Sequence, residues 1–325
     1  MDKSESAILN KIAERVRNYR GLMRKSDVGL VSSLLPVEGR EGIIAAKGED
    51  GAILKLGSKK IAFAADGVIE ELIDANPEWA GYCSVLVNVN DMLAMHARPY
   101  SAVNVISARD RATLTDIVSG MRQACDKFNV KMVGGHLHPD AFHNSISVAM
   151  IGEVVDNKPL LSTTARIDEK VIIVCDCRGE FTPGIPYSWD CTSQKSKKEI
   201  SSLMDRTLKA LSRFSSGKDI SNPGLLGTLG MLLESSKIGA EIDIGEIPLP
   251  SGVDIIQWLT TYHGLGFVGT APESAISKIA ADLKNTCLSV SVIGQTFRQK
   301  KLKMRFGKSE TVLFDFSKDK ITGLY

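Results

Sequence analysis

Residues 64–95, AADGVIEELIDANPEWAGYCSVLVNVNDMLAM, decide the fold, and they give two conflicting local signals. Val85, Val87 and Val89 alternate with other residues, and this period of two favours a β-strand. In a helix, Ser84, Asn88, Asp91 and Met95 would instead lie on one face, because they are spaced four, three and four residues apart. Under either interpretation, an apolar run ends in the polar group NVND (88–91).

Three other short segments carry polar residues that a nucleotide site would need. They are KGEDGAIL (47–54), FAADGV (63–68) and VGGHLHPD (133–140). Magnesium in a polyphosphate site prefers a few carboxylates and completes its shell with water and phosphate oxygens. Glycines let backbone N–H groups approach phosphate closely. Each segment alone is a common turn pattern, so the signal lies in their combined order along the chain.

The bulk composition indicates an ordinary globular protein. The 325 residues suggest two domains, with 43% hydrophobic and 24% charged residues. A net charge of +2 is too small to indicate a nucleic-acid or membrane partner, and we interpret the basic residues Lys300, Lys301, Lys303 and Arg305 as a solvated edge. No apolar run approaches the roughly 20 residues that span a bilayer, and the charged N-terminus lacks a signal-peptide core. We therefore expect a cytoplasmic protein.

The cysteines show neither a disulfide framework nor zinc-site spacing. The six positions are scattered: 83, 125, 175, 177, 191 and 287. Cys175 and Cys177 lie in VIIVCDC, where an alternating strand would place both on one face. We interpret them as small core residues in a reducing cytosol, rather than as a redox or metal pair.

The order of predicted elements indicates two α/β domains, each with its own sheet. In the first half we predict a helix over 6–20, a break over 29–42 at Pro36 and several glycines, strands 52–56, 61–65, 100–107, 131–135 and 145–154, and a helix from an N-cap at Thr113 to about 128. The polar stretch 157–169, which contains Pro159, marks the domain boundary. The predicted domains are a helical extension (1–40), an N-terminal domain (41–158) and a C-terminal domain (159–325).

In the second half we predict strands 171–177, 240–244, 266–271 and 288–295, and helices 195–214, 225–236, 253–262 and 274–285. The segment FTPGIPYSWDCTS (181–193) has two prolines and no clear period, so it is a long irregular loop. Trp189 in this loop could cover a substrate or be part of an ordered structural loop. The sequence leaves both open.

The ordered segments resemble the AIR synthetase superfamily of ATP-using enzymes. That family includes AIR synthetase, selenophosphate synthetase, thiamine-monophosphate kinase and a hydrogenase-maturation enzyme. Five family motifs match in order: GEDGA (48–52), ADG (65–67), the N-x-x-D-x-x-A-M helix (88–95), GGH (134–136) and DISNPGL (219–225). The resemblance runs from about residue 40 to 295 and is closest to the AIR synthase-related branch, which includes a methanogenesis-marker group. It decides for a helix in the conflicting stretch.

The resemblance implies a fold and a set of site residues. The fold is a two-domain α/β (α+β) AIR synthetase-like fold, whose N-terminal domain has a dimer-forming sheet and whose C-terminal domain is a ferredoxin-like sandwich. The implied metal ligands are Glu49, Asp50, Asp66 and Asp91. The implied catalytic residues are Asp66, Asp91 and His136. The implied nucleotide-binding residues are Lys47, Asn88, Asn90, Gly134, Gly135 and Asp219.

The expected function is that of an ATP- and Mg²⁺-dependent kinase or ligase. It would phosphorylate or activate a small molecule at an oxygen of an amide, carboxyl or phosphate group, as a homodimer. Phosphoryl transfer needs carboxylates that hold metal more than it needs a nucleophilic side chain. Selenophosphate synthesis is disfavoured because no cysteine precedes Cys83. A nucleotide-binding regulator without turnover is the alternative, because His96 and His136 depart from the family pattern.

Four of the five histidines, His96, His136, His138 and His143, are expected in or near the cleft. The last three lie within GGHLHPDAFH and could supply three zinc ligands. Because no fourth ligand is evident, we favour a polar loop whose histidines bond phosphate or backbone. An acid–base role for His136 or His138 is a third possibility.

Overall fold

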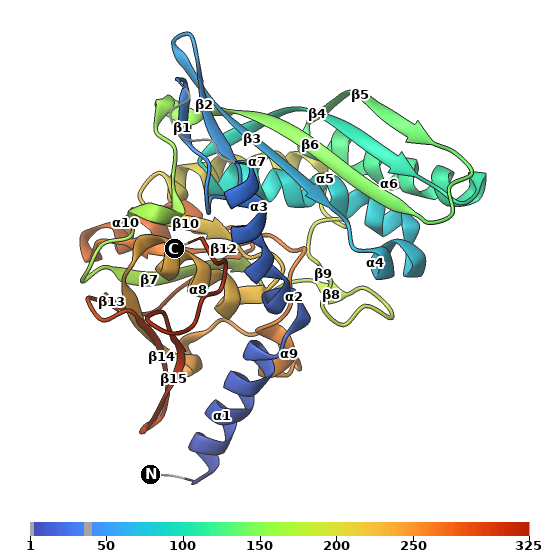
Figure 1. The fold of residues 1–325 in the computed structure, drawn as a ribbon. Coiled ribbons are helices and arrows are strands. Elements are labelled where there is room, and N and C mark those ends of the chain that lie inside the picture. Colours follow the sequence, from blue (N-terminus) through green and yellow to red (C-terminus); the bar gives the residue numbers. More distant parts are fainter. Residues whose placement is uncertain (1–2, 36–40, 325) are drawn as a thin grey trace.

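The computed structural model of the protein describes residues 3–35 and 41–324. Two sheets, each with its own helices, build the molecule (Figure 1). Strands of the first sheet come from residues 43–154 and those of the second from 170–315. The predicted mixed α/β fold with two sheet-containing domains is therefore confirmed. The boundary placed at 158/159 falls between the two sheets and stays a prediction, and Pro36 lies outside the described residues.

The first sheet has six strands in the order β1-β2-β3-β6-β4-β5. Its strands are β1 (Ile43–Ala45), β2 (Ala52–Leu56), β3 (Lys59–Gly67), β4 (Ala97–Ser107), β5 (Lys131–His138) and β6 (Ser145–Val154). Only the β4–β5 pair is parallel among these described strands. One face is covered by α4 (Glu70–Ala75), α5 (Pro77–Ala94) and α6 (Arg111–Phe128). The predicted strands 52–56 and 61–65 are confirmed, and they form the antiparallel hairpin β2–β3.

The conflicting stretch forms the helix α5. Its first turn is fixed by the Asn76 side chain, which accepts a hydrogen bond from Trp79 N at 3.0 Å, and by Pro77 in the first turn. Val85 and Val89 are both completely buried, and the helix is apolar on nearly all sides. Packing on every side overrides the strand preference of β-branched residues. The alternation of valines therefore reflects a fully buried helix.

Two glycines bring α5 and α6 into backbone contact. A Cβ atom on Gly120 would lie 1.8 Å from the Glu78 carbonyl oxygen, and one on Gly81 would lie 2.0 Å from that of Ile117. The helices can approach this closely only because both side chains are hydrogen atoms. The N-cap of α6 is Asp110, whose carboxylate accepts from Thr113 N at 2.8 Å, so the predicted cap at Thr113 is wrong by three residues.

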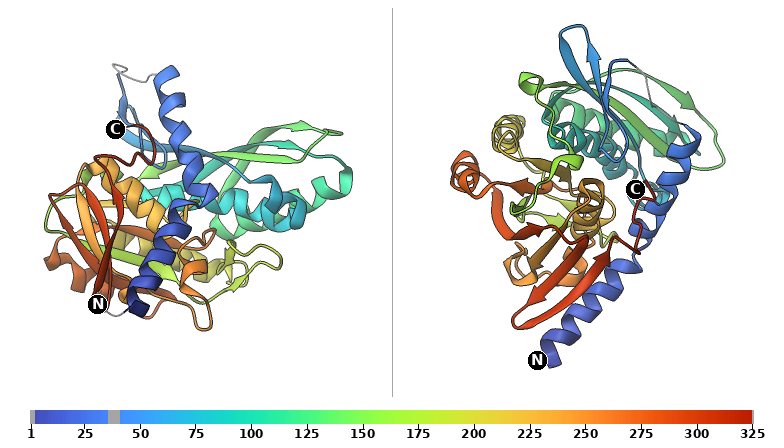
Figure 2. Two further views of the ribbon diagram at one scale, coloured as in Figure 1. Left: turned by 60° about the horizontal axis from the view of Figure 1, so that its bottom comes forward. Right: turned by 60° about the vertical axis from the view of Figure 1, so that its left-hand side comes forward.

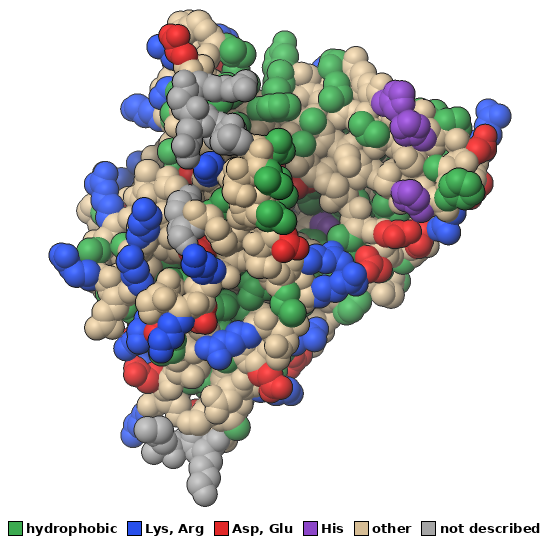
Figure 3. All heavy atoms as spheres, in the orientation of Figure 1, with side chains coloured by type: hydrophobic (Ala, Val, Ile, Leu, Met, Phe, Trp, Pro, Cys, Tyr) green, Lys and Arg blue, Asp and Glu red, His purple; other side chains and the backbone are tan. Residues whose placement is uncertain are grey.

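The opposite face of the first sheet is open and apolar. Alternation along the strands buries one set of side chains under α5 and exposes the other. The exposed set is 37–45% accessible and includes Phe63, Val103, Val105 and Ile151. Figure 3 shows hydrophobic side chains spread over the upper part of the molecule. The sheet therefore presents an apolar face that no described residue covers.

The second sheet has seven strands in the order β10-β12-β7-β13-β11-β14-β15. They are β7 (Lys170–Asp176), β10 (Ser216–Asp219), β11 (Gly239–Asp243), β12 (Gly266–Ala271), β13 (Leu288–Phe297), β14 (Lys301–Phe306) and β15 (Ser309–Asp315). The main helices are α7 (Lys197–Leu211), α8 (Gly224–Ser236) and α10 (Glu273–Leu283), with the single-turn α9 (Ile255–Trp258). Alternate residues of β7 face two different cores, Ile172 and Val174 toward α7 and α10, Val171 and Ile173 toward α8.

The strands β10, β14 and β15 were not predicted. The basic residues interpreted as a solvated edge lie mostly in β14, which is an interior strand between β11 and β15. Arg305 pairs with Asp243 at 2.6 Å and Lys301 with Asp315 at 3.3 Å. The expectation of a free basic edge is therefore wrong, because neighbouring carboxylates neutralise this strand.

The N-terminal helices run along one side of both domains (Figures 1 and 2). They are α1 (Lys3–Arg17), α2 (Arg20–Met23), the 3-10 turn η1 (Arg24–Asp27) and α3 (Val28–Leu34). Arg17 Nε of α1 donates to Leu313 O of β15 at 2.9 Å. The C-terminal tail lies beside α3, where Gly29 N donates to Thr322 O at 2.8 Å. None of the helices that the structure describes has the length and apolarity to cross a membrane.

Candidate functional site

Three carboxylates from distant parts of the sequence meet between the two domains. Asp50 precedes β2, Asp91 lies in the last turn of α5, and Asp219 ends β10. One oxygen of each lies within 4.8 Å of the others. The first two come from the first domain and the third from the second. The cluster therefore depends on the packing of both domains.

Two of these carboxylates have oxygens without a hydrogen-bond partner among the described residues, namely Asp91 Oδ2 and Asp219 Oδ1. Asp91 is only 5% exposed and Asp219 only 2%. Burial raises the pKa of Asp91 well above its ordinary value, and the charges of Asp66 and Asp219 raise it further. Burial also raises the pKa of Asp219, with the charge of Asp50 as the next cause. Buried, unpartnered carboxylates of this kind need a compensating cation.

A buried lysine and a second aspartate adjoin the cluster. Lys218 forms an ion pair with Asp50, and its Nζ donates to Gly48 O at 3.2 Å. Its pKa is raised, because the attraction of Asp50 and Glu49 outweighs the effect of burial. Asp66, at the end of β3, lies close enough to raise the pKa of Asp91. Lys218 balances one of the negative charges and leaves the others available to a metal.

Glu49 has a different role from the expected metal ligand. Its carboxylate accepts hydrogen bonds from Ser162 N at 2.6 Å and Thr163 Oγ1 at 3.0 Å. These contacts tie the loop before β2 to the segment that joins the domains. Because both oxygens are used in this way, Glu49 does not belong to the three-carboxylate cluster.

A cavity of about 760 Å³ surrounds the cluster. Figure 3 looks onto the hollow between the domains, which acidic and basic side chains border. Its walls come from α2, η1 and α3, from the loop that contains Tyr262 and His263, and from the C-terminal tail at Thr322 and Leu324. Three buried carboxylate oxygens beside open space suit a hard cation such as Mg²⁺, which keeps several waters or phosphate oxygens as ligands. The residues present therefore fit magnesium.

The structure brings only part of the expected site together. The expected residues that line the cavity are Lys47, Glu49, Asp50, Asp66, Asp91 and Asp219. Asn88 and Asn90 are buried outside it: Asn88 Nδ2 donates to Ser84 O at 3.0 Å, and Asn90 Nδ2 to Gly264 O at 2.9 Å. Asn90 thus links α5 to the second domain rather than contacting a ligand in this chain.

The glycine pair of the GGH motif is part of the strand β5. Gly134 and Gly135 continue the parallel register with β4, in which Gly135 faces Asn104. A Cβ atom on Gly135 would lie 2.3 Å from Asn104 Oδ1, so a close strand contact explains this glycine. His136 and His138 follow in the same exposed edge strand, with ring centroids 4.5 Å apart. The strand predicted over 131–135 is therefore confirmed as the first part of β5, and these residues are not among those that line the cavity of their own chain.

The histidine of the cavity is His263, which sequence analysis missed. None of His96, His136, His138 and His143 is among its lining residues, so their expected position near the cleft is wrong for a single chain. His96 ends α5 and bonds Lys158 O through Nδ1 at 2.8 Å. The motif TYHGLG (261–266) offered one signal, since a glycine-flanked histidine is a frequent turn element.

A hydrogen-bond network fixes the His263 ring. Ser188 Oγ accepts from Trp79 Nε1 at 2.8 Å and from Thr182 Oγ1 at 3.1 Å, which uses both of its lone pairs. Its own proton therefore goes to His263 Nδ1, 3.1 Å away, and leaves the ring proton on Nε2. His263 also has φ +74°, a left-handed conformation that costs a non-glycine residue about 1–3 kcal/mol. The surrounding structure holds this histidine in a fixed orientation.

The buried state of His263 predicts a pH-dependent stability. Burial lowers the pKa of His263 to about 3. Below about pH 6.5 the unfolded chain binds a proton there that the folded chain does not, so stability falls between about pH 6.5 and 3. From pH 7 to 5, wild type should lose about 2 kcal/mol more than His263→Asn, in which asparagine tolerates the positive φ. Urea unfolding at both pH values measures this difference, and equal losses would contradict it.

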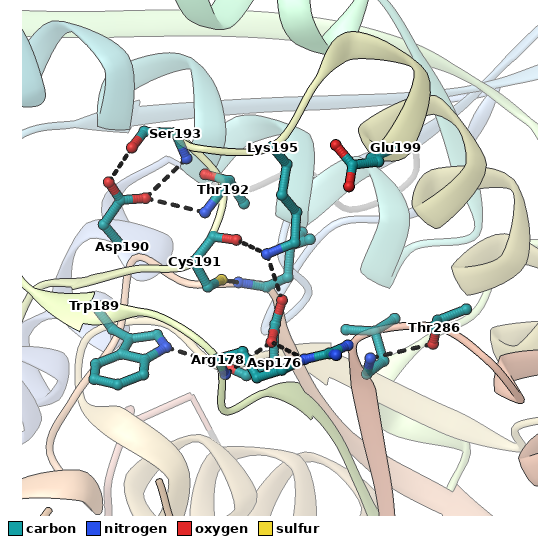
Figure 4. Close-up of polar contacts among 12 residues, drawn as sticks. Asp176, Arg178, Trp189, Asp190, Cys191, Thr192, Ser193, Lys195, Glu199 and Thr286 are labelled. Atoms are coloured by element: carbon teal, nitrogen blue, oxygen red, sulfur yellow. Dashed lines mark hydrogen bonds and ion pairs between the residues drawn. The ribbon is translucent and has the colours of Figure 1, made fainter. Parts of the chain in front are cut away.

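The loop that carries Ser188 is held by the buried ion pair shown in Figure 4. Lys195 Nζ lies 2.8 Å from Asp176 Oδ2 at the end of β7. Trp189 is 4% exposed, and its Nε1 donates to Asp176 O at 3.0 Å. The short pair β8 (Glu180–Phe181) and β9 (Trp189–Asp190) completes the loop. Trp189 thus belongs to an ordered structural loop, and the alternative of a substrate cover is not supported.

The cysteines near this loop are free thiols. Cys175 and Cys177 lie on the same side of the chain, with Sγ atoms 3.7 Å apart. Cys191 is buried, and its Sγ accepts from Leu265 N at 3.1 Å. This agrees with the expected shared face of the pair in VIIVCDC.

Comparisons with known proteins place this architecture in a family. The model of the AIR synthase related protein N-terminal domain matches residues 48–154, and that of the C-terminal domain matches residues 197–307. The uncharacterized protein MJ0640 of Methanocaldococcus jannaschii is 37% identical over 97% of this chain and 99% of its own length. A thiamine-monophosphate kinase of Methanospirillum hungatei is 28% identical over 69% of this chain and 76% of its own.

Solved structures show the same fold at low sequence identity. A ThiL structure, "AaThiL complexed with AMPPCP and TMP", has a TM-score of 0.64 and 18% identity, with 88% of this chain and 96% of that one covered. The Thermotoga maritima PurL complexed with ATP has a TM-score of 0.69 and 16% identity, with 83% of this chain covered. The chain spans about half the length of that PurL, of which 47% is covered.

The two sheet-containing domains with a carboxylate cluster between them define a protein of the AIR synthase type. The chain belongs to the AIR synthase related family, with both of its domains represented.

Proposed function

We propose that the protein is an ATP- and Mg²⁺-dependent enzyme that transfers the γ-phosphoryl group of ATP to a small molecule. The observation that carries the proposal is the convergence of Asp50, Asp91 and Asp219 within 4.8 Å beside a cavity large enough for a nucleotide. Relatives that include thiamine-monophosphate kinases and a selenide, water dikinase support the choice of reaction class.

In this proposal the three carboxylates hold magnesium, which would neutralise charge on the β- and γ-phosphates. Asp66, next to Asp91, would hydrogen-bond a water of the metal, and Lys47 and Lys218 border the same space. This ligand set differs from the expected one, because Asp219 is added and neither Glu49 nor Asp66 is a direct ligand. Asp219 lies in the second domain, so the two domains would close on the metal together.

The proposed phosphoryl transfer is a simple displacement at the γ-phosphorus of ATP. An oxygen of the acceptor forms a bond to the γ-phosphorus, and the bond from that phosphorus to the β,γ-bridging oxygen breaks. ADP leaves with the electron pair of the broken bond. A hydroxyl acceptor releases its proton, whereas a carboxylate acceptor needs to release none. Positioning and charge neutralisation supply most of the catalysis in such reactions.

The experiment that tests the proposal is a melting curve of the protein with the ATP analogue AMPPCP, with and without Mg²⁺. We expect a rise in melting temperature that requires both components. A ligand at about 100 times its dissociation constant adds roughly 2.7 kcal/mol. That corresponds to a rise of about 5–10 °C for domains of this size. The absence of any rise with the two together would contradict nucleotide binding.

We further propose that the protein is a cytoplasmic homodimer, formed through the open face of the first sheet. The apolar side chains of this face, among them Phe63, Val103 and Ile151, would otherwise remain in water. The same pairing would bring the edge strand β5, with Gly134, Gly135 and His136, against a second copy. We propose that these three residues act across that interface.

The dimer makes a prediction that mutagenesis can test. Wild type should scatter light as a particle of twice 35.2 kDa, and Val103→Asp should reduce it to a monomer. A charge in an apolar interface core is not tolerated without a partner. Val118→Asp is the matched control, because Val118 is 46% exposed, close to the 43% of Val103, but lies on α6 away from the open face. A monomeric wild type, or dissociation by the control alone, would contradict this interface.

A further inference from the structure

Beyond the carboxylate cluster, the cavity has a second polar region at the N-terminal helices. It lies where η1 faces the loop of Tyr262 and His263. The family models match only residues 48–154 and 197–307, so η1 is outside them. The extension therefore supplies one wall of this region and the C-terminal domain the other, and the proposed magnesium site does not use it.

The protein side of this region is built from buried polar groups without partners. Tyr262 is 6% exposed, and its hydroxyl has no hydrogen-bond partner among the described residues. The same holds for Asn222 Oδ1, which also lines the cavity. His263 adds the N–H that its contact with Ser188 leaves at Nε2. Unsatisfied buried groups are costly, so a ligand that completes them is the natural explanation.

Two rings hold these groups in place. Tyr187 stacks on Tyr262 with centroids 5.3 Å apart and an interplanar angle of 8°. The ring of His263 lies 4.1 Å from that of Tyr262. The Tyr187 hydroxyl is also buried without a described partner. The surface is therefore rigid as well as unsatisfied, as a specific binding site requires.

Two cations of η1 border the region and divide it. The charge of Lys25 is close enough to Asp219 to lower the pKa of that carboxyl. The charge of Arg24 instead acts on Tyr187 and Tyr262. Neither cation forms an ion pair with another of the described residues. Both cations line the cavity, Lys25 within electrostatic reach of the metal cluster and Arg24 within reach of the two tyrosines.

We propose that this region binds the acceptor of the phosphoryl group, and that the acceptor is a small organic anion whose charged group pairs with Arg24. Tyr262, Asn222 and His263 Nε2 hydrogen-bond its polar atoms. The apolar side chains of Val28 and Val31 on α3 line the same cavity and contact its carbon skeleton. This inference rests on the proposed function, and it narrows the acceptor to carboxylic acids and phosphate esters.

The test uses two simple anions, acetate and inorganic phosphate, as probes for the two acceptor classes. Each is titrated by melting temperature in the presence of saturating Mg²⁺ and AMPPCP, so that the nucleotide site is occupied. At least one probe should give a further, saturable rise in wild type. Arg24→Gln should raise the dissociation constant of that probe by about tenfold or more, because a charged hydrogen bond is lost. The rise caused by AMPPCP should be unchanged in this variant.

Two further variants keep the test decisive. Arg298→Gln removes an exposed arginine outside the cavity and should bind the probe like wild type. Tyr262→Phe removes one buried, unpartnered hydroxyl. Its melting temperature without ligands should therefore equal or exceed that of wild type, whereas its affinity for the probe should be lower. A purely structural tyrosine would show neither the weakened binding nor a dependence on the probe.

The outcomes separate this inference from the proposed function. Equal probe affinity in Arg24→Gln, or no probe binding in wild type, overturns the anion site. Loss of the AMPPCP rise in Arg24→Gln also overturns it, because Arg24 would then serve the nucleotide. If wild type shows no AMPPCP rise but Arg24→Gln still weakens the probe, the anion site stands and the nucleotide proposal fails. Acetate binding alone indicates a carboxylic acid, and phosphate binding alone a phosphate ester.

Discussion

Replacement of Asp91 by asparagine is expected to abolish the stabilisation by Mg²⁺ and AMPPCP while leaving the free protein at least as stable as wild type. Asp91 lies beside Asp50, Asp66 and Asp219, and its pKa is raised by burial and further by repulsion from these carboxylates. Asparagine keeps the shape and removes one negative charge, so repulsion in the free protein decreases. The same change removes a ligand from the metal, and the phosphates then lose part of their counter-charge.

The measurement compares melting temperatures with and without the two ligands. With the ligand at roughly 100 times its dissociation constant, the melting temperature of wild type should rise by about 5–10 °C. The melting temperature of Asp91→Asn should rise hardly at all. Asp116→Asn, on the exposed surface of α6, is the control and should behave as wild type. An equal rise in Asp91→Asn would remove this carboxylate from the site.

Lys195→Met should lower the free energy of unfolding by about 3–5 kcal/mol. This is the largest effect on stability that we expect from the loss of one ion pair. The Asp176 side chain is completely buried and Lys195 is 18% exposed, with Nζ and Oδ2 2.8 Å apart. Removal of the lysine leaves this buried carboxylate with only the exposed Arg178 side chain, at 3.9 Å, as a cation. The loop that carries Ser188 and Trp189 would lose its anchor on β7 (Figure 4).

Urea unfolding measures this effect, with a matched control two residues along the chain. Lys197 pairs with Asp126 at 2.9 Å, but both side chains are more than half exposed. Lys197→Met should therefore cost only about 0–1 kcal/mol. The double change Asp176→Asn with Lys195→Met should recover part of the loss, because no buried charge is then left unpaired. Similar losses in Lys195→Met and Lys197→Met would show that the buried pair has no special weight.

The fold could be predicted where several local signals agreed. The strands β2, β3 and β6 and the helix α8 lie close to their predicted ranges, because alternation or periodicity coincided with turn residues at their ends. The helix α5 was different, since its valines favour a strand when taken alone. Only the spacing of Asn88, Asp91 and Met95 within a family motif indicated the helix. Its all-round burial explains why local propensity was misleading.

Only part of the candidate site could be predicted from the sequence, because some of its residues depend on how the two domains pack. Asp50, Asp91 and Asp219 each lie in a motif of the family that the sequence resembles, and such positions are recognisable in a sequence. Lys218 and His263 carry no such signal, because their roles depend on which loop of the second domain reaches the first. The edge strand β5 was predicted over its first five residues. Close contact with Asn104 explains why Gly135 lies within a strand.

The most direct test of the central claim is the position of the metal in crystals grown with AMPPCP and Mn²⁺, a magnesium substitute with strong anomalous scattering. We predict one or more manganese peaks ligated by Asp50, Asp91 and Asp219, with phosphate oxygens of AMPPCP on the open side. A manganese peak at His136 and His138 instead, or AMPPCP bound without metal away from the three carboxylates, would contradict it.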